Sequence, residues 1–163
     1  MILICDASPL IFLAKLGRLD LIRLLLADRV VVLRCVAEEV LGDRASFGER
    51  VALTSFLASV ETVDFDESNF GSQTLSASDR STLTYAVKHR ADLLLADERL
   101  LRRIAAEEGI ATIGTLGLIM LAVEKGVLSP VDARADLDRA VTTHGFRISA
   151  ELYRQVIGAL ENQ

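Results

Sequence analysis

The 163-residue sequence contains no tryptophan, two cysteines and two histidines, and each of these small numbers excludes a class of protein. Two cysteines, Cys5 and Cys35, cannot form the disulfide framework typical of a small secreted domain. Each follows an apolar run, so we expect two buried, reduced thiols, with a bridge between them as the alternative. Because aromatic residues make up 5% of the chain, extensive stacking on nucleic-acid bases is not expected.

Several familiar catalytic motifs are also missing. The sequence contains no G-x-S-x-G elbow, no P-loop and no G-x-G-x-x-G, and the G-T-L-G at 114–117 is interpreted as a strand-to-helix turn. Both histidines, His89 and His144, fall at expected helix ends, where the helix dipole favours an imidazolium. That structural role is preferred to a catalytic one for each of them.

Neither a signal peptide nor a membrane span is expected. Asp6 interrupts the apolar start, and no basic segment precedes it. The longest apolar region, Leu21–Leu33, is broken by charged residues. These features favour a cytoplasmic protein without a membrane partner. The net charge of −5 argues against coating nucleic acid by bulk electrostatics, although a carboxylate cluster around cations would itself lower the formal charge.

Short apolar runs alternate with amphipathic segments along the chain. The apolar runs predict strands at Ile2–Cys5, Val30–Leu33, Val60–Phe65, Asp92–Ala96 and Ile110–Ile113. The amphipathic segments predict helices at Pro9–Leu16, Asp20–Ala27, 35–42, Phe47–Ser59, 76–90, Glu98–Glu108, Thr115–Lys125, Val131–Thr143 and Ala150–Glu161. Ser8 is the expected N-cap of the first helix. Strands alternating with helices across short loops predict an α/β fold, a three-layer α/β/α sandwich with a mainly parallel central sheet.

The length is most simply that of one domain. The polar stretch Asp66–Ser76 is interpreted as an internal loop, because the pieces on either side are too small for separate cores. We therefore expect a single domain over 1–163, with C-terminal helices in 130–163. Two helices near the C-terminus carry apolar rows, Leu116, Ile119, Met120 and Val123 on one and Leu152, Val156, Ile157 and Leu160 on the other. A two-fold axis could bury these rows in a homodimer, and burial in the chain's own core is the alternative.

Four acidic residues stand out by position. Asp6 follows the first expected strand and Asp97 the fourth, so both carboxylates belong at the same edge of a parallel sheet. Like charges there repel unless a cation or a proton intervenes, and carboxylate oxygens suit Mg²⁺ or Mn²⁺. Glu39, in the helix after the second strand, and Asp79, in the first turn of the helix before Asp97, flank that edge. Each acid also has a local interpretation, as a helix cap or a solvated side chain.

Five further segments, together with the opening DASPLIFLAKLGRLDLI, carry a resemblance. They are the V-x-x-E-V-L of Val36–Leu41, the SDRSTLTYA of Ser78–Ala86, ADLLLADERLLRR, IGTLGLIMLA and GFRISAELY. In this order and spacing they resemble the PIN domain over nearly the whole chain. The similarity is greatest to a prokaryotic PIN-like branch that shares the D-A-S-P-L opening.

The resemblance implies a metal-dependent ribonuclease that hydrolyses RNA phosphodiester bonds. It places Mg²⁺ or Mn²⁺ on four acids: Asp6, Glu39, Asp79 and Asp97. Glu39 matches the family's helix acid better than Glu38 because an apolar pair follows it, and Ser8 matches a small hydroxyl residue that supports the site. Many members are toxins of toxin–antitoxin pairs and many are homodimers, which implies an antitoxin protein and a second copy as partners.

The sequence departs from the common PIN pattern at two positions. Many PIN nucleases have Thr or Ser two residues before the strand-end acid, where this chain has Leu95, and relatives often have Pro at the position of Leu33. Leu95 removes a polar support of Asp97. A catalytically weak PIN-like module that binds nucleic acid or protein is therefore the alternative function.

Basic residues near the acidic edge are candidate contacts for RNA phosphates. These are Lys15, Arg80, Arg99 and Arg103. The alternative is that they are solvated and paired, Arg103 with Glu107 and Arg102 with Glu98. The acids suit the chemistry independently of the family, because carboxylate-held divalent ions can activate water, neutralise a phosphate and stabilise a leaving oxygen.

Overall fold

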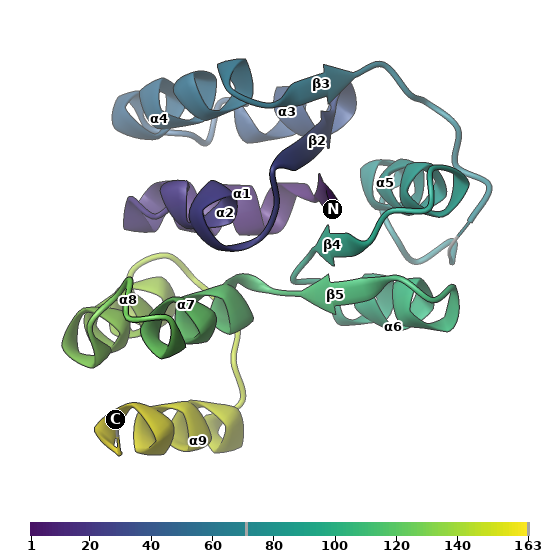
Figure 1. Cartoon of the computed structure of the whole chain (residues 1–163). Helices are drawn as coiled ribbons and strands as arrows, with labels where there is room; N and C mark the ends of the chain where they lie inside the picture. The colour runs from purple at the N-terminus through teal and green to yellow at the C-terminus, as the bar shows by residue number, and fades with distance from the viewer. Residues whose placement is uncertain (71, 163) are drawn as a thin grey trace. The chain divides into compact units, whose positions relative to one another are not determined.

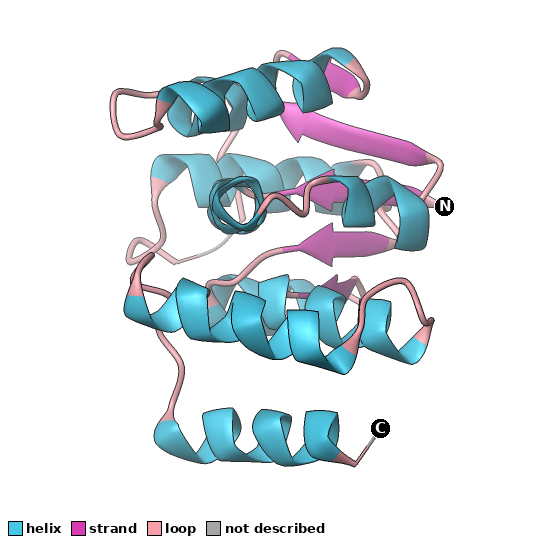
Figure 2. Cartoon of the chain, turned by 90° about the vertical axis from the view of Figure 1, so that its left-hand side faces the viewer, coloured by secondary structure: helices cyan, strands magenta, loops and turns pink. Residues whose placement is uncertain are grey.

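The centre of the molecule is a parallel sheet whose strand order, among the residues that the structure describes, is β3-β2-β1-β4-β5. Its strands are β1 (Ile2–Cys5), β2 (Arg29–Leu33), β3 (Glu61–Val63), β4 (Leu93–Leu95) and β5 (Ala111–Ile113). Figure 2 shows them as magenta arrows that point the same way. The structure is a computed structural model that describes residues 1–70 and 72–162. Gly71, in the predicted loop, and Gln163 lie outside the described residues.

Helices lie between and after these strands along the described chain. They are α1 (Ala7–Leu16), α2 (Asp20–Leu25), α3 (Arg34–Val40), α4 (Phe47–Ala58), α5 (Ala77–Lys88), α6 (Arg99–Glu107), α7 (Thr115–Glu124), α8 (Pro130–Thr142) and α9 (Ala150–Glu161). Figure 1 shows α5 and α6 on one side of the sheet and α1, α2 and α4 on the other. The predicted three-layer α/β/α sandwich is confirmed. In the described part of the chain, no helix has the length and apolar character needed to cross a bilayer.

The chain forms two compact units, Met1–Thr115 and Leu116–Gln163. The first contains the whole sheet. In the second, α8 packs on α9, the Tyr153 hydroxyl donates to Asp138 Oδ1 at 2.5 Å, and Arg134 pairs with Glu161 at 2.8 Å. That residues 1–163 behave as one domain stays a prediction.

The apolar rows near the C-terminus are largely buried. Four of the eight side chains are at most 7% exposed: Ile119, Val123, Val156 and Leu160. Leu152, at 42% exposure, is the most accessible member of its row. Burial within the chain therefore accounts for much of the pattern from which a dimer was expected.

The central strand is buried on both faces. Leu3, Ile4 and Cys5 are fully inaccessible, and most of β2 is buried as well. A parallel strand covered by helices on both sides needs a continuous apolar run, which explains the absence of alternation in these segments. Cys5 and Cys35 are both free thiols, as predicted, although Cys35 is partly exposed rather than buried. Burial raises the pKa of the Cys5 thiol, and the neighbouring Asp6 charge adds to the effect.

Among the element boundaries that differ from the sequence prediction, two have a clear physical reason. The first helix begins at Ala7 with Asp6 as its N-cap residue, so the prediction of Ser8 as N-cap was wrong. Pro9 still falls in the first turn, where its missing N–H costs the helix no hydrogen bond. Strand β3 covers Glu61–Val63 rather than six residues, because three of its residues pair with β2.

The strand order places a topological switch between β1 and β4. From β1 the chain proceeds to β2 on one side, whereas β4 is followed by β5 on the other. The Asp6 N–H donates to the Leu95 carbonyl at 2.9 Å, and the Ala96 N–H donates to the Ile113 carbonyl at 2.9 Å, which extends the ladder past the carboxyl ends of the strands. In open α/β sheets, ligands bind in the crevice at this kind of switch point.

Candidate metal centre

Asp6 is a buried carboxylate at the carboxyl end of the central strand. Its exposure is 2%, and its Oδ1 atom is buried with no hydrogen-bond partner among the residues that the structure describes. An ionised carboxylate with one buried oxygen that lacks a partner is expensive to bury, by several kcal/mol. Such a group must be protonated, or it must bind a cation.

The surroundings of Asp6 oppose its ionisation. Its pKa is raised to about 8, first by burial and then by the negative charge of Asp79, with further contributions from Glu39 and Asp97. A hydrogen bond from the Ala7 backbone acts in the opposite direction but does not cancel them. The fold thus brings the four acids into one electrostatic neighbourhood, although they come from the residue after β1, from α3, from α5 and from the segment after β4.

Asp97 is held by a set of polar partners. The Thr115 N–H donates to its Oδ1 at 2.7 Å, and the Thr115 hydroxyl donates to its Oδ2 at 2.6 Å. Burial raises the pKa of Asp97, whereas the bonds from Thr115, the charge of Arg102 and a hydrogen bond from Ser8 act to lower it. Ser8 therefore contacts one of the four acids directly.

Asp79 and Glu39 lie at less buried positions. Asp79, in the first turn of α5, forms a capping box with Ser76: its N–H donates to Ser76 Oγ at 3.0 Å, and its Oδ2 accepts from the Ser76 N–H at 3.4 Å. Asp79 therefore caps α5, as its local interpretation predicted, and its charge also raises the pKa of Asp6. Glu39 is an exposed residue near the end of α3.

The residues present fit a divalent cation in chemistry, but they do not enclose one in this geometry. Within residues 1–70 and 72–162, no three acidic, histidine or cysteine side chains are grouped closely enough to hold a metal ion. Mutual repulsion is expected to keep carboxylates apart when no cation lies among them. The buried Asp6 Oδ1 without a partner is the atom that favours a cation, because hard oxygen ligands are what Mg²⁺ and Mn²⁺ prefer.

The candidate RNA contacts are partly engaged by other side chains. Three of them have partners: Lys15 pairs with Glu49 at 2.6 Å, Arg80 donates to Gln73 at 3.4 Å, and Arg103 lies 3.8 Å from Glu107. The pairing of Arg103 with Glu107 agrees with the local alternative. Arg99 is exposed at the start of α6. Arg102, expected beside Glu98, instead acts on Asp97, and it was absent from the candidate contacts.

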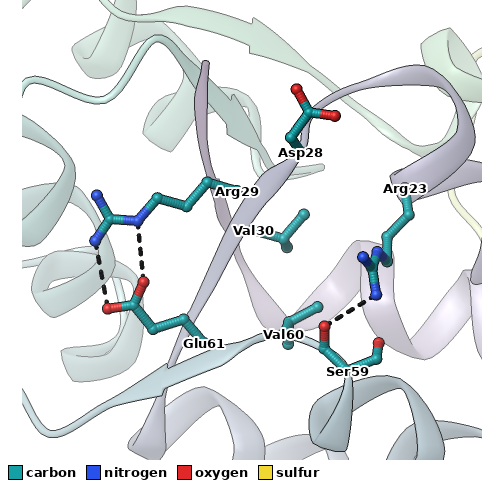
Figure 3. A pocket seen from close by; sticks show the side chains of 7 residues that line it. All are labelled: Arg23, Asp28, Arg29, Val30, Ser59, Val60 and Glu61. Atoms are coloured by element: carbon teal, nitrogen blue, oxygen red, sulfur yellow. Dashed lines mark hydrogen bonds and ion pairs between the residues drawn. The ribbon is translucent and has the colours of Figure 1, made fainter.

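The opposite edge of the sheet carries charges of both signs in pairs. Arg29, the first residue of β2, donates to Glu61, the first of β3, at 3.0 and 3.4 Å. Arg23 donates to the Ser59 carbonyl at 3.0 Å, and these residues line a surface cavity of about 200 Å³ (Figure 3). The accumulation of like charge is thus a property of the carboxyl edge.

Comparison with known proteins identifies the family. The family model DUF3368, described as a PIN domain, matches residues 2–162. The chain belongs to the PIN-domain family. Its fold is also similar to a solved structure, a PilT N-terminus domain protein from the hyperthermophilic archaeon Sulfolobus solfataricus P2. That match has a TM-score of 0.55 and 16% identity, and it covers 76% of this chain and 95% of the other. No curated protein matches the sequence.

The PIN family as a whole has a characteristic activity. PIN domains are usually nucleases, they act on nucleic acids, and they typically use divalent metals such as Mg²⁺ or Mn²⁺. The similarity to the archaeal protein, at 16% identity, concerns the fold alone. Sequence reasoning missed Thr115, which donates to Asp97 from 18 residues further along the chain. It considered Arg102 as a partner of Glu98 and not of Asp97, on which the arginine's charge acts.

Proposed function

We propose that this PIN domain is a Mg²⁺- or Mn²⁺-dependent ribonuclease whose acids are Asp6, Glu39, Asp79 and Asp97. The observation that carries the proposal is Asp6 Oδ1, a buried carboxylate oxygen without a partner in the described chain, at the switch point of the sheet. Three further carboxylates raise its pKa. An arrangement that is unfavourable in the absence of a cation is the arrangement that a cation-binding site requires.

The role that we propose for each of the four acids follows from how deeply it is buried. Asp6, at 2% exposure, would hold the cation most deeply, and Asp97 would present oxygens already oriented by Thr115 and Ser8. The more accessible Glu39 and Asp79 would complete the site toward solvent. When bound, a divalent cation neutralises a phosphodiester's charge and acidifies water. Exposed Arg99 would contact the RNA backbone beyond the acids.

A cleavage assay with matched variants tests this function. Purified wild-type protein should cleave a mixed-sequence RNA in Mn²⁺ or Mg²⁺ and stop when EDTA is added. Asp6→Asn and Asp97→Asn keep the shape of the side chain and remove its charge, so both should lose cleavage. Asp136→Asn is the matched control, because Asp136 is also 2% exposed but pairs with Arg139 in the second unit.

The outcomes separate the two functions considered for this chain. Cleavage that persists in Asp6→Asn would contradict the proposal and indicate a contaminating nuclease. RNA binding without cleavage by the wild type, at any divalent ion concentration, would instead support the catalytically weak binding module. Equal loss in Asp136→Asn would indicate general damage to the fold.

The finer roles rest on the resemblance to PIN toxins and have their own tests. As a cytoplasmic toxin with a protein antitoxin, the chain should arrest growth when expressed, and a small neighbouring gene should relieve the arrest. The Asp6→Asn variant should not arrest growth. A homodimer should give twice the chain mass in light scattering at micromolar concentration.

A further inference from the structure

One residue contacts both oxygens of Asp97. The Thr115 backbone N–H donates to Oδ1 and its hydroxyl donates to Oδ2, at 2.7 and 2.6 Å. Thr115 is itself 1% exposed, so water does not compete freely for these bonds. Two bonds from one rigid residue fix the rotation of a carboxylate more strongly than a single bond to one oxygen.

The glycine before Thr115 leaves the space that Asp97 occupies. A Cβ atom at Gly114 would lie 2.9 Å from Asp97 Oδ1, closer than real Cβ contacts come. It would also lie 3.3 Å from the Ala96 carbonyl and 3.3 Å from Arg102 Nη1. The glycine is therefore needed for the close approach of Asp97 to the turn, so any side chain here would displace the carboxylate or the arginine.

The contact between Thr115 and Asp97 is one of several polar interactions that Asp97 makes, so it does more than cap α7. Arg102 Nη1 lies near the same glycine and its charge acts on Asp97, and Ser8 adds another hydrogen bond from α1. Leu95, two residues before Asp97, has no polar atom with which to do the same. Because a carboxylate has about four acceptor sites, the two bonds from Thr115 leave lone pairs on each oxygen for a cation.

We propose that Gly114 and Thr115 form a positioning element that holds the Asp97 carboxylate in the orientation from which it binds a divalent cation. This inference rests on the proposed function, since it assumes that Asp97 is a metal ligand. Thr115 is then a positioning residue, and it supplies from the start of α7 the hydroxyl support that β4 lacks. Groups that orient a metal ligand commonly change metal affinity 10–100-fold when they are removed.

Mn²⁺ titration of the full chain, followed by electron paramagnetic resonance of the free ion, tests the inference without an activity assay. Thr115→Val keeps the shape and the backbone N–H but removes the hydroxyl, so it should weaken Mn²⁺ binding by about 10-fold or more. Thr115→Ser retains the hydroxyl and should stay within about 3-fold of the wild type. Gly114→Ala should weaken binding by crowding Asp97 Oδ1.

Thr84→Val is the matched control. Thr84 is fully buried in the same unit, donates to the Arg80 carbonyl and accepts from the Phe70 N–H, so its loss also removes hydrogen bonds. It should lower the melting temperature and leave Mn²⁺ affinity unchanged, which is what a structural role alone predicts. Circular dichroism checks the fold of each variant, and if Thr115→Val does not fold, the comparison of Gly114→Ala with Thr115→Ser decides.

Wild-type affinity in Thr115→Val and Gly114→Ala would overturn the inference while leaving the proposed function intact. Equal weakening in Thr84→Val would also overturn it, because the effect would then be general destabilisation. If the wild type itself binds no Mn²⁺, the proposed function fails and the inference fails with it. The wild-type titration alone therefore distinguishes the two failures.

Discussion

Charged side chains are arranged differently at the two edges of the sheet. At the amino edge, Arg29 and Glu61 are exposed and form a two-bond ion pair (Figure 3). At the carboxyl edge, Asp6 is buried, its Oδ1 has no partner in the described residues, and the nearby acids carry the same sign. Paired charges of opposite sign need no bound ion. Buried charges of the same sign repel one another, and a bound cation relieves that repulsion. This difference in charge between the two edges, more than the presence of acids, favours the carboxyl edge as the candidate site.

The largest expected difference between the edges is catalytic. Asp79→Asn should reduce RNA cleavage at least about 10-fold, because it removes a carboxylate from the proposed metal site. Asparagine can still accept the Ser76 N–H, so the cap of α5 and the melting temperature should change little. Glu61→Gln, at the amino edge, should cleave RNA within about 2-fold of the wild type. Equal cleavage by Asp79→Asn and Glu61→Gln would remove the functional contrast.

Metal binding at the carboxyl edge should depend on pH. Because the pKa of Asp6 is about 8, a cation must displace its proton at neutral pH. Mn²⁺ affinity should therefore rise about 10-fold for each pH unit between 6 and 8 and level off above that range. Calorimetry in buffers of different ionisation enthalpy would detect the released proton. Affinity that is flat across this range would contradict a protonated Asp6.

Metal-free stability should show the same titration with a defined sign. The pKa of Asp6 is about 8 in the folded protein and near 3.8 when unfolded, so the folded state binds more protons between these values. The free energy of unfolding should then fall as the pH rises from 4 to 8. Asp6→Asn should remove this fall and stabilise the metal-free protein at pH 8, by on the order of 1 kcal/mol for each unit of pKa shift. Urea denaturation in EDTA at both pH values measures the difference, with Asp136→Asn as the control.

The smallest effect is expected at the amino edge. Arg29→Ala breaks an ion pair whose side chains are 54% and 43% exposed, so the free energy of unfolding should change little. The change should shrink further in high salt. A shift of the urea midpoint as large as that of Asp6→Asn would show that an exposed pair at this edge affects stability as much as the buried acid at the other.

Sequence reasoning succeeded where chemistry is local. The run Ile2–Cys5 is the central strand, and the acids after β1 and β4 share the carboxyl edge because parallel strands align their ends. The helix start was misplaced by two residues, since both Asp6 and Ser8 are suitable caps and the tertiary bond from Ser8 to Asp97 cannot be seen in the sequence.

Contacts that depend on strand register could not be predicted from the sequence. Leu95 correctly indicated that no hydroxyl precedes Asp97, but the support that Thr115 provides depends on β5 pairing with β4. The G-T-L-G turn at 114–117 was correctly placed, yet nothing in its residues says that an acid from another loop fills the space above the glycine. Helix faces likewise suggested a dimer surface; four of the eight residues on those faces are buried in the chain, and the dimer stays a prediction.

The long separation between the two halves of the site has a consequence for synthesis. Asp6 emerges from the ribosome well before Asp97 and Thr115, which donates to Asp97 and follows most of the sheet in the chain. Until β4 and β5 have joined β1, the first acid has neither its neighbours nor its buried setting. If the chain is the ribonuclease proposed above, it passes most of its synthesis without an assembled site, and it would cleave RNA only after this non-local pairing is complete.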